Sequence, residues 1–213
     1  MKLRGNPAIF VAALFLAGAG NAVAAPRVIV EHVGPFDAIA LHGRFRLDFT
    51  SGAARSVRLA GDPYLVENLA VSVKRGVLLI DRPAPLDLPK RETVEVTITA
   101  PALAELTTRG FVRAELRGLS GPRFDFTNDG AAAATLSGQV GRFSMVSRGV
   151  ASIDASGLHA AGARIAARGQ ANLIVFASKD ANVTMYGEGR VVVLGHPKAH
   201  TFKSLAYGVI TQR

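Results

Sequence analysis

The sequence contains no cysteine and no tryptophan, and only three tyrosines among its 213 residues. Without cysteine, the chain cannot use disulfides, thiol catalysis or thiolate metal sites. A domain of this length can bury enough apolar surface to fold without cross-links. The scarcity of tryptophan and tyrosine, with no basic stretch that carries interleaved aromatics, argues against a nucleic-acid-binding module. The sequence also lacks a phosphate-binding loop, a dinucleotide fingerprint and a serine nucleophile elbow.

The first 25 residues predict a secretory signal peptide. Lys2 and Arg4 precede an uncharged, mostly apolar run over residues 8–20, and small residues then form an A-x-A-like site before Pro26. The alternative, an uncleaved anchor, is weaker because a membrane-spanning helix needs about twenty apolar residues. An exported protein without disulfides fits a bacterial envelope. We therefore expect a mature domain of residues 26–213 in the periplasm or at the surface of a Gram-negative bacterium.

The formal net charge of the whole chain is +9 at pH 7. A surface with such an excess of cations attracts polyanions. Much of the excess is arginine beside abundant alanine and glycine, so a compositional origin stays open as the alternative.

Alternation of apolar and polar residues predicts short β-strands over residues 27–100. Phe45, Leu47 and Phe49 alternate with polar residues, and residues 94–98 repeat the pattern. A period of two indicates strands that are buried on one face. Three prolines in residues 83–89 predict a loop. We expect this region to hold N-terminal strands and a cap.

A repeat of 18 to 20 residues begins after Pro101. Its anchor glycines are Gly110, Gly130, Gly149, Gly169 and Gly187. Every position six and four residues before an anchor, and four and six residues after it, is apolar. These twenty positions are Ala104, Leu106, Ala114, Leu116, Phe124, Phe126, Ala134, Leu136, Phe143, Met145, Ile153, Ala155, Ala163, Ile165, Leu173, Val175, Ala181, Val183, Val191 and Val193.

Two short inward-facing strands per repeat, separated by glycine corners, are typical of a parallel β-solenoid. Each coil needs a stacked neighbour to bury its apolar face. A β-sandwich of antiparallel hairpins is the alternative, but hairpins do not require equal apolar columns in every repeat. We therefore predict an all-β fold, a single-stranded parallel β-helix with regular coils over residues 101–195 and a C-terminal tail or cap over residues 196–213.

Most of the mature chain resembles the autotransporter-adhesin head domain called the GIN domain. The segments that carry the resemblance are Phe36-Asp37-Ala38-Ile39, Val57-Arg58-Leu59-Ala60-Gly61-Asp62, residues 71–80, Val94-Glu95-Val96-Thr97-Ile98, Pro101-Ala102-Leu103, the anchored repeats, Gly187-Glu188-Gly189 and Gly195-His196-Pro197. The resemblance implies a right-handed parallel β-helix at the cell envelope, with no catalytic residue to carry over and no cofactor. The family's small Ser-Gly-Ser anchors are replaced here by charged residues beside glycine.

These charged residues suggest a binding surface. The residues just before the anchors are Arg109, Asp129, Arg148, Arg168 and Tyr186, and equivalent positions in successive coils stack on one face. Together with Arg113 and Arg190, the arginines would form a basic stripe for anionic polysaccharide, lipopolysaccharide or phospholipid headgroups. A solvated ladder, in which Asp129 relieves the repulsion between its arginine neighbours, is the alternative.

No converged catalytic or metal site is expected. Carbohydrate-cleaving sites need carboxylates that meet on one patch. Asp125 and Asp129 share a strand, whereas Asp154 and Asp180 fall in other columns. His196 and His200 flank a proline and predict a surface loop. The main hypothesis is a non-enzymatic envelope protein that presents a rigid basic surface for adhesion; the alternative is a carbohydrate-active enzyme, a polysaccharide lyase or hydrolase.

Overall fold

The computed structural model describes residues 27–31, 33–82 and 93–213. The predicted signal peptide and the predicted proline loop lie outside the described residues. The described chain is nearly all β, as the sequence predicts, and it also holds one short helix that was not predicted from the sequence. Its elements are β1 (Arg27–Glu31), β2 (Ala38–Ser51), β3 (Ser56–Gly61), α1 (Pro63–Glu67), β4 (Ala70–Lys74), β5 (Val77–Asp81), β6 (Val94–Ala100), β7 (Glu105–Met185), β8 (Glu188–Leu194), β9 (Ala199–Ser204) and β10 (Gly208–Gln212).

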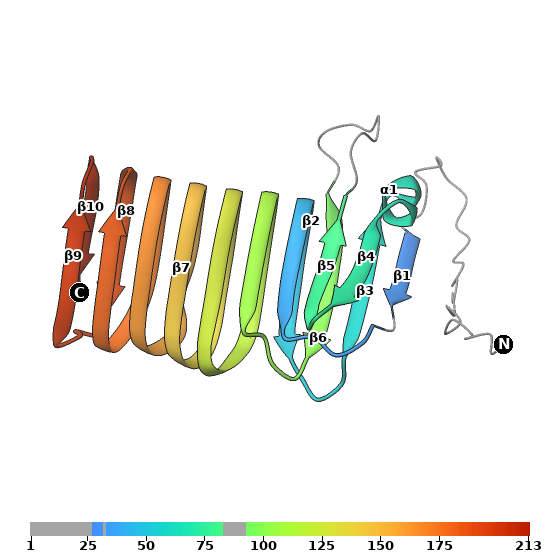
Figure 1. Ribbon diagram of the computed structural model, residues 1–213, viewed down its shortest axis with the longest axis horizontal. Helices are drawn as coiled ribbons and strands as arrows, with labels where there is room; N and C mark the ends of the chain where they lie inside the picture. The colour runs from blue at the N-terminus through green and yellow to red at the C-terminus, as the bar shows by residue number, and fades with distance from the viewer. Residues whose placement is uncertain (1–26, 32, 83–92) are drawn as a thin grey trace, which may run out of the picture.

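The chain winds into a stack of coils in which neighbouring strands run parallel. β2 pairs in parallel with the start of β7, from Ala38 opposite Glu105 to Thr50 opposite Arg117. The end of β7 pairs in parallel with β8 and β9, and β8 pairs in parallel with β10. Figure 1 shows the coils of β7 between β2 and β8. Parallel pairing in the stack is not what a sandwich of antiparallel hairpins would give.

The predicted apolar columns form the interior of this stack. All of the twenty positions except Ala104 are buried. Ala104, which lies just before β7 begins, is half-buried. Alternation within each strand therefore fixes which residues face inward, as the repeat predicted.

The anchor glycines stack on one another because the corner leaves no room for a side chain. A Cβ placed on Gly110 would collide with the carbonyl oxygen of Gly43, and the same collision recurs from each anchor to the glycine one coil before it. Gly110 also has φ +104°, which L-residues with a side chain rarely adopt. The spacing of 18 to 20 residues is thus the length of one coil.

Three polar side chains continue one interior column. Thr108, Asn128 and Ser147 are each only 1 % exposed. Thr108 Oγ1 donates to Asn128 Oδ1 over 3.1 Å, and Asn128 Nδ2 donates to Ser147 Oγ over 3.1 Å. Asn128 Nδ2 also lies 3.2 Å from the carbonyl oxygen of Val150. Because the buried amide is satisfied by neighbouring coils, this ladder links three coils without leaving an orphan polar group.

β2 is a coil of the stack that the repeat does not reveal. Gly43 lies opposite Gly110 in the β2–β7 register, and Leu47 and Phe49 follow Gly43 at the same four- and six-residue positions as the apolar columns. Residues 52–104 are inserted between this coil and the next. Within the described part of that insertion, β5 and β6 pair in parallel with β2.

The remaining N-terminal elements close that end of the stack. β3 pairs antiparallel with β6, β1 with β3, and β4 with β5. α1 begins with Pro63, and Asp62 caps it by accepting a hydrogen bond from the Leu65 amide at 3.1 Å. Leu65 and Val66 on α1 join the core. The N-terminal end of the interior is therefore covered.

Candidate functional site

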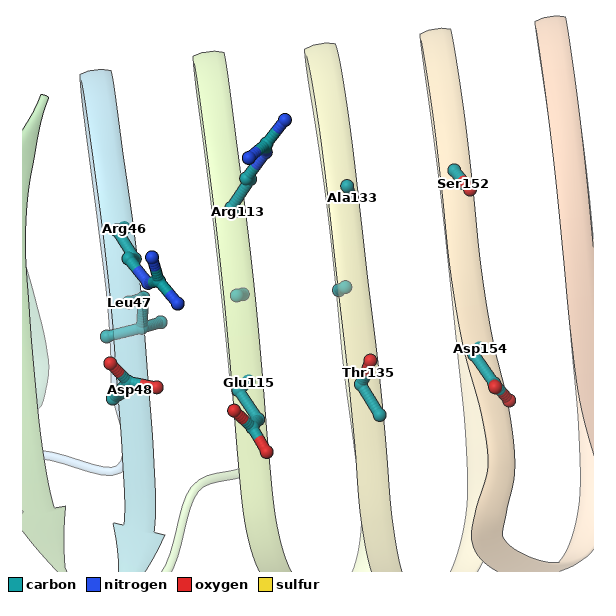
Figure 2. Close-up of a pocket in the computed structure, with 11 residues that line it drawn as sticks. Arg46, Leu47, Asp48, Arg113, Glu115, Ala133, Thr135, Ser152 and Asp154 are labelled. Atoms are coloured by element: carbon teal, nitrogen blue, oxygen red, sulfur yellow. The ribbon is translucent and has the colours of Figure 1, made fainter.

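Two outward-facing rows run across β2 and the first coils of β7. Three residues after each glycine, Arg46 and Arg113 are followed by the short side chains of Ala133 and Ser152; we call this the arginine row. Five residues after each glycine lies the carboxylate row, which consists of Asp48, Glu115, Thr135 and Asp154. The register places Arg46 beside Arg113 and Asp48 beside Glu115, and Figure 2 shows the two rows side by side.

The two rows line one shallow groove with a volume of about 360 Å³. Leu47, Ala114 and Ala134 also line it, between the two rows. The long side chains of Arg46 and Arg113 project from two coils. On the next two coils, the short side chains of Ala133 and Ser152 project much less from the surface. The groove therefore crosses four coils, with cations on one side of its first two coils and mainly carboxylates along the whole of the other side.

Two guanidinium groups lie near the aromatic ring of Phe111 at one end of the groove. The guanidinium carbon of Arg44 lies 4.3 Å from the ring centroid, and that of Arg113 lies 6.0 Å from it. Arg46 stands beside Arg113 in the register, as Arg109 does beside His42. We call Arg44, Arg46 and Arg113 the arginine cluster. Among the described residues, none of these three arginines makes a salt bridge within 4.0 Å, so their charge is not neutralised there.

The carboxylates of the groove are held in different ways. Glu115 Oε1 lies 2.5 Å from Arg117 Nη2, outside the groove lining. Asp154 Oδ1 accepts hydrogen bonds from the Ser156 hydroxyl at 2.6 Å and from its backbone amide at 3.0 Å. These two bonds, with the side-chain bond the larger cause, lower the pKa of Asp154. The carboxylate is therefore ionised at neutral pH and can accept, but not donate, hydrogen bonds.

The structure divides the predicted basic stripe into separate environments. Arg113 belongs to the arginine cluster, whereas Arg109 lies opposite His42 and does not line the groove. Arg148 Nη1 binds Asp129 Oδ1 at 2.8 Å, and Arg168 lies with its guanidinium carbon 5.1 Å from the ring centroid of Tyr186.

Arg190 stands far along the stack, opposite Val209 of β10. Within the predicted stripe, Arg148 therefore makes an ion pair and Arg168 makes a cation–π contact between coils, and Arg113 is the one member that lines the groove. Whether the five arginines bind a ligand stays a prediction.

Sequence reasoning missed Arg44, Arg46 and Asp48, which the structure adds to the site. They lie on β2, and the register brings Arg46 and Asp48 beside Arg113 and Glu115. The sequence does contain a signal for this coil: Gly43 is followed by apolar residues four and six positions later, as the anchor glycines are.

The other acidic and histidine residues considered in the sequence lie apart from the groove. Asp125 Oδ2 is 3.3 Å from Arg123 Nε, and Asp180 Oδ2 is 3.8 Å from Arg142 Nη2. His200 stacks on Phe202 with ring centroids 4.9 Å apart. Within the described residues, no group of three histidine, aspartate or glutamate side chains is placed to hold a metal ion.

Together these features define an all-β domain of stacked coils with a charged groove across one face. Residues 35–197 match the family described as "Putative auto-transporter adhesin, head GIN domain", and the chain belongs to this family. The resemblance drawn from the sequence is thereby confirmed. Adhesin membership implies an exported or surface protein. In the part of the chain that the structure describes, no helix is long and apolar enough to cross a membrane.

Solved structures share the fold at low sequence identity. A putative adhesin from Bacteroides fragilis is similar with a TM-score of 0.72 and 18% identity, over 89% of this chain and 98% of that chain. A putative lipid binding protein from Parabacteroides distasonis is similar with a TM-score of 0.50 and 14% identity, over 90% of this chain and 98% of that chain. The comparison with curated proteins found no match.

Proposed function

We propose that this chain is an exported, non-enzymatic protein of the cell envelope that binds anionic polysaccharide in the groove and thereby serves adhesion. The scaffold we propose is a right-handed parallel β-helix, the hand that parallel strand connections adopt in nearly all known cases. The observation that carries the proposal is a groove across four stacked coils in which Arg46 and Arg113 stand beside the carboxylate row.

The chemistry of the two rows suits an acidic sugar chain. An arginine guanidinium binds carboxylate, sulfate or phosphate groups through parallel hydrogen bonds, so Arg46 and Arg113 can hold the acidic groups. Asp48, Glu115 and Asp154 can accept hydrogen bonds from sugar hydroxyls, and Thr135 can donate or accept. Adjacent coils offer such groups about every 4.8 Å. A stack of paired strands holds them in place before binding, which lowers the entropic cost of association.

At this groove, the observations favour a polysaccharide over a flat phospholipid surface. The carboxylate row would lie against the phosphates of a lipid layer and repel them, whereas a narrow chain can meet both rows at once. An acidic polysaccharide and the glycan of lipopolysaccharide share the required chemistry. Separate binding assays with free polysaccharide and with lipopolysaccharide identify which of the two supplies the bound sugar chain.

The test is retention on immobilised polygalacturonate, with neutral dextran as the reference matrix. We expect the protein to be retained on the acidic matrix and released as salt rises, because exposed charge interactions are screened. The Arg46→Gln/Arg113→Gln variant should bind at least about tenfold more weakly, since it loses two charge-assisted contacts.

A matched control is the Arg123→Gln/Arg148→Gln variant, which removes the same charge from two ion pairs outside the groove. It should bind within about twofold of the wild type, because long-range charge alone contributes little at moderate salt. Retention that is insensitive to salt, or that both double variants weaken equally, would contradict the groove as the site. In the second case the whole basic surface, including the predicted stripe with Arg109, Arg168 and Arg190, becomes the better description.

A carbohydrate-active enzyme is the alternative, and one observation speaks for it: three carboxylates lie in a single row of the groove. Acid catalysis of glycosidic cleavage needs a carboxyl group with a raised pKa. The pKa of Asp154 is instead lowered by Ser156. Incubation with acidic polysaccharides decides between the two: binding without product supports the proposal, whereas new reducing or unsaturated ends would establish an enzyme.

A further inference from the structure

The C-terminal end of the stack differs from its covered N-terminal end. β9 pairs with β7, and β10 pairs with β8; in the described chain, no strand pairs with their outer edges. Phe202 and Ile210 continue the interior columns opposite Val183 and Val191. They are only half-buried, whereas Val183 and Val191 are fully buried. The last coil therefore leaves the end of the core partly open.

Large apolar side chains gather on the outside of this last coil. Leu205, Tyr207 and Val209 have 64%, 88% and 49% of their surface exposed. Tyr186, on the preceding coil, is also exposed. The Leu205 amide donates to the Met185 carbonyl oxygen at 2.8 Å, which places Leu205 beside Tyr186. We call Tyr186, Leu205, Tyr207 and Val209 the C-terminal corner.

The surroundings of the C-terminal corner are basic. No aspartate or glutamate follows Glu188 in the sequence, and the same segment carries Arg190, Lys198, Lys203 and Arg213. Arg190 lies opposite Val209 in the β8–β10 register. Arg168, on the coil before Tyr186, places its guanidinium over the Tyr186 ring. Exposed apolar side chains are thus interleaved with cations, and Glu188, at the start of β8, is the one acidic residue on β8, β9 and β10.

We propose that the C-terminal corner docks on the surface of an anionic lipid bilayer. Tyrosine and leucine favour the boundary between headgroups and acyl chains, where an aromatic ring can bury its apolar body and keep its hydroxyl wet. Lysine and arginine beside them are attracted to anionic headgroups. The corner thus combines the two components that hold peripheral proteins at a membrane surface.

The same charge argues against a second copy of the chain as the occupant. Two copies paired through the outer edges of β9 and β10 would bring Lys198 and Lys203 of each copy toward those of the other. Like charges across such an interface are costly. An anionic lipid surface instead complements the corner. This proposal uses a different surface from the polysaccharide groove and does not depend on it.

The test is co-sedimentation with vesicles of phosphatidylcholine alone or mixed with phosphatidylglycerol. We expect binding to the anionic vesicles and little binding to the neutral ones. The Leu205→Ser/Tyr207→Ser variant should lose at least about tenfold in affinity, because it removes the most exposed apolar groups. The Arg190→Gln/Lys203→Gln variant should lose affinity for anionic vesicles as well.

A matched control is Tyr64→Ser/Val150→Ser, which removes two exposed apolar side chains elsewhere on the surface. It should bind the anionic vesicles as the wild type does. Equal binding to neutral and anionic vesicles, or equal binding by the Leu205→Ser/Tyr207→Ser variant and its control, would overturn the proposal. So would a dimer in sedimentation velocity that the Leu205→Ser/Tyr207→Ser variant abolishes, since a second copy would then be the occupant.

Discussion

Asp154, at one end of the carboxylate row, owes its lowered pKa to a single neighbouring residue. Both hydrogen bonds to Asp154 Oδ1 come from Ser156. We expect Ser156→Ala to raise the pKa of Asp154 toward its ordinary value, because the hydroxyl bond is the larger of the two causes that lower it. An NMR titration of the side-chain carboxyl carbon measures the change directly.

The same substitution has a defined effect on stability. Because the lowered pKa belongs to the folded state, the ionised carboxylate favours folding above its unfolded-state pKa, and this contribution disappears as pH falls through the lowered value. Ser156→Ala should therefore lower the free energy of unfolding at neutral pH. In acid, where Asp154 is protonated, the variant should be as stable as the wild type. Ser152→Ala, in the arginine row, is the control. A pKa of Asp154 that is equal in both variants would show that Ser156 does not set it.

At the scale of the coil, two physical effects favour glycine at the corners: a positive φ, and close contact with the preceding coil. Gly169 has φ +105°, and a Cβ there would collide with the carbonyl oxygen of Gly149. Gly121 has φ +131° with open space around it, and Gly34 has open space without a positive φ. We expect Gly34→Ala to change the free energy of unfolding by less than about 0.5 kcal/mol.

The other two glycines should be more sensitive. Gly121→Ala should cost about 1 kcal/mol or more, because the backbone is strained for a residue with a Cβ. Gly169→Ala should cost clearly more than Gly121→Ala, since the coils must also move apart. Urea denaturation of the three variants gives the order. Equal losses at Gly121 and Gly169 would mean that dihedral strain, not coil contact, accounts for the glycine column.

The interior of the coils could be predicted because each coil repeats the same geometry in consecutive sequence. Phe124 and Phe126, for example, recur as Phe143 and Met145 one coil later, and all four are buried. Ala104 fits the pattern but is half-buried, although its backbone already bonds to Asp37 and Asp125 of the neighbouring coils. Over residues 196–213, for which the sequence predicts a tail or cap, the register places His200 and Gln212 at column positions that are apolar in the preceding coils.

The groove could be predicted only in part. Arg113 was singled out from the sequence, but its neighbour Arg46 was not. The insertion over residues 52–104 separates β2 from β7. Gly43 is therefore much farther from Gly110 than one repeat length, and the repeat pattern does not include Gly43 or the other residues of its coil. The pairing of Arg46 with Arg113 depends on strand register, which connects residues far apart in sequence. Spacing in the sequence does not contain that information.

Over the whole molecule, the groove and the C-terminal corner lie on different coils of one stack. The groove ends on the coil of Asp154, and three coil steps, on the order of 15 Å, lead from there to the last coil. Both surfaces sit on parallel strands that are continuously paired. If both proposals hold, one molecule can hold a polysaccharide and a lipid surface at the same time.

We therefore expect the protein to bridge the two ligands. Polygalacturonate beads coated with wild-type protein should capture dye-loaded vesicles that contain phosphatidylglycerol. Arg46→Gln/Arg113→Gln should leave the protein on vesicles but not on beads, and Leu205→Ser/Tyr207→Ser should leave it on beads that no longer capture vesicles. The two matched control variants should bridge like the wild type. Competition between soluble polygalacturonate and vesicles for the wild type would instead mean that a single surface binds both, because two separate sites on a rigid stack can be filled together.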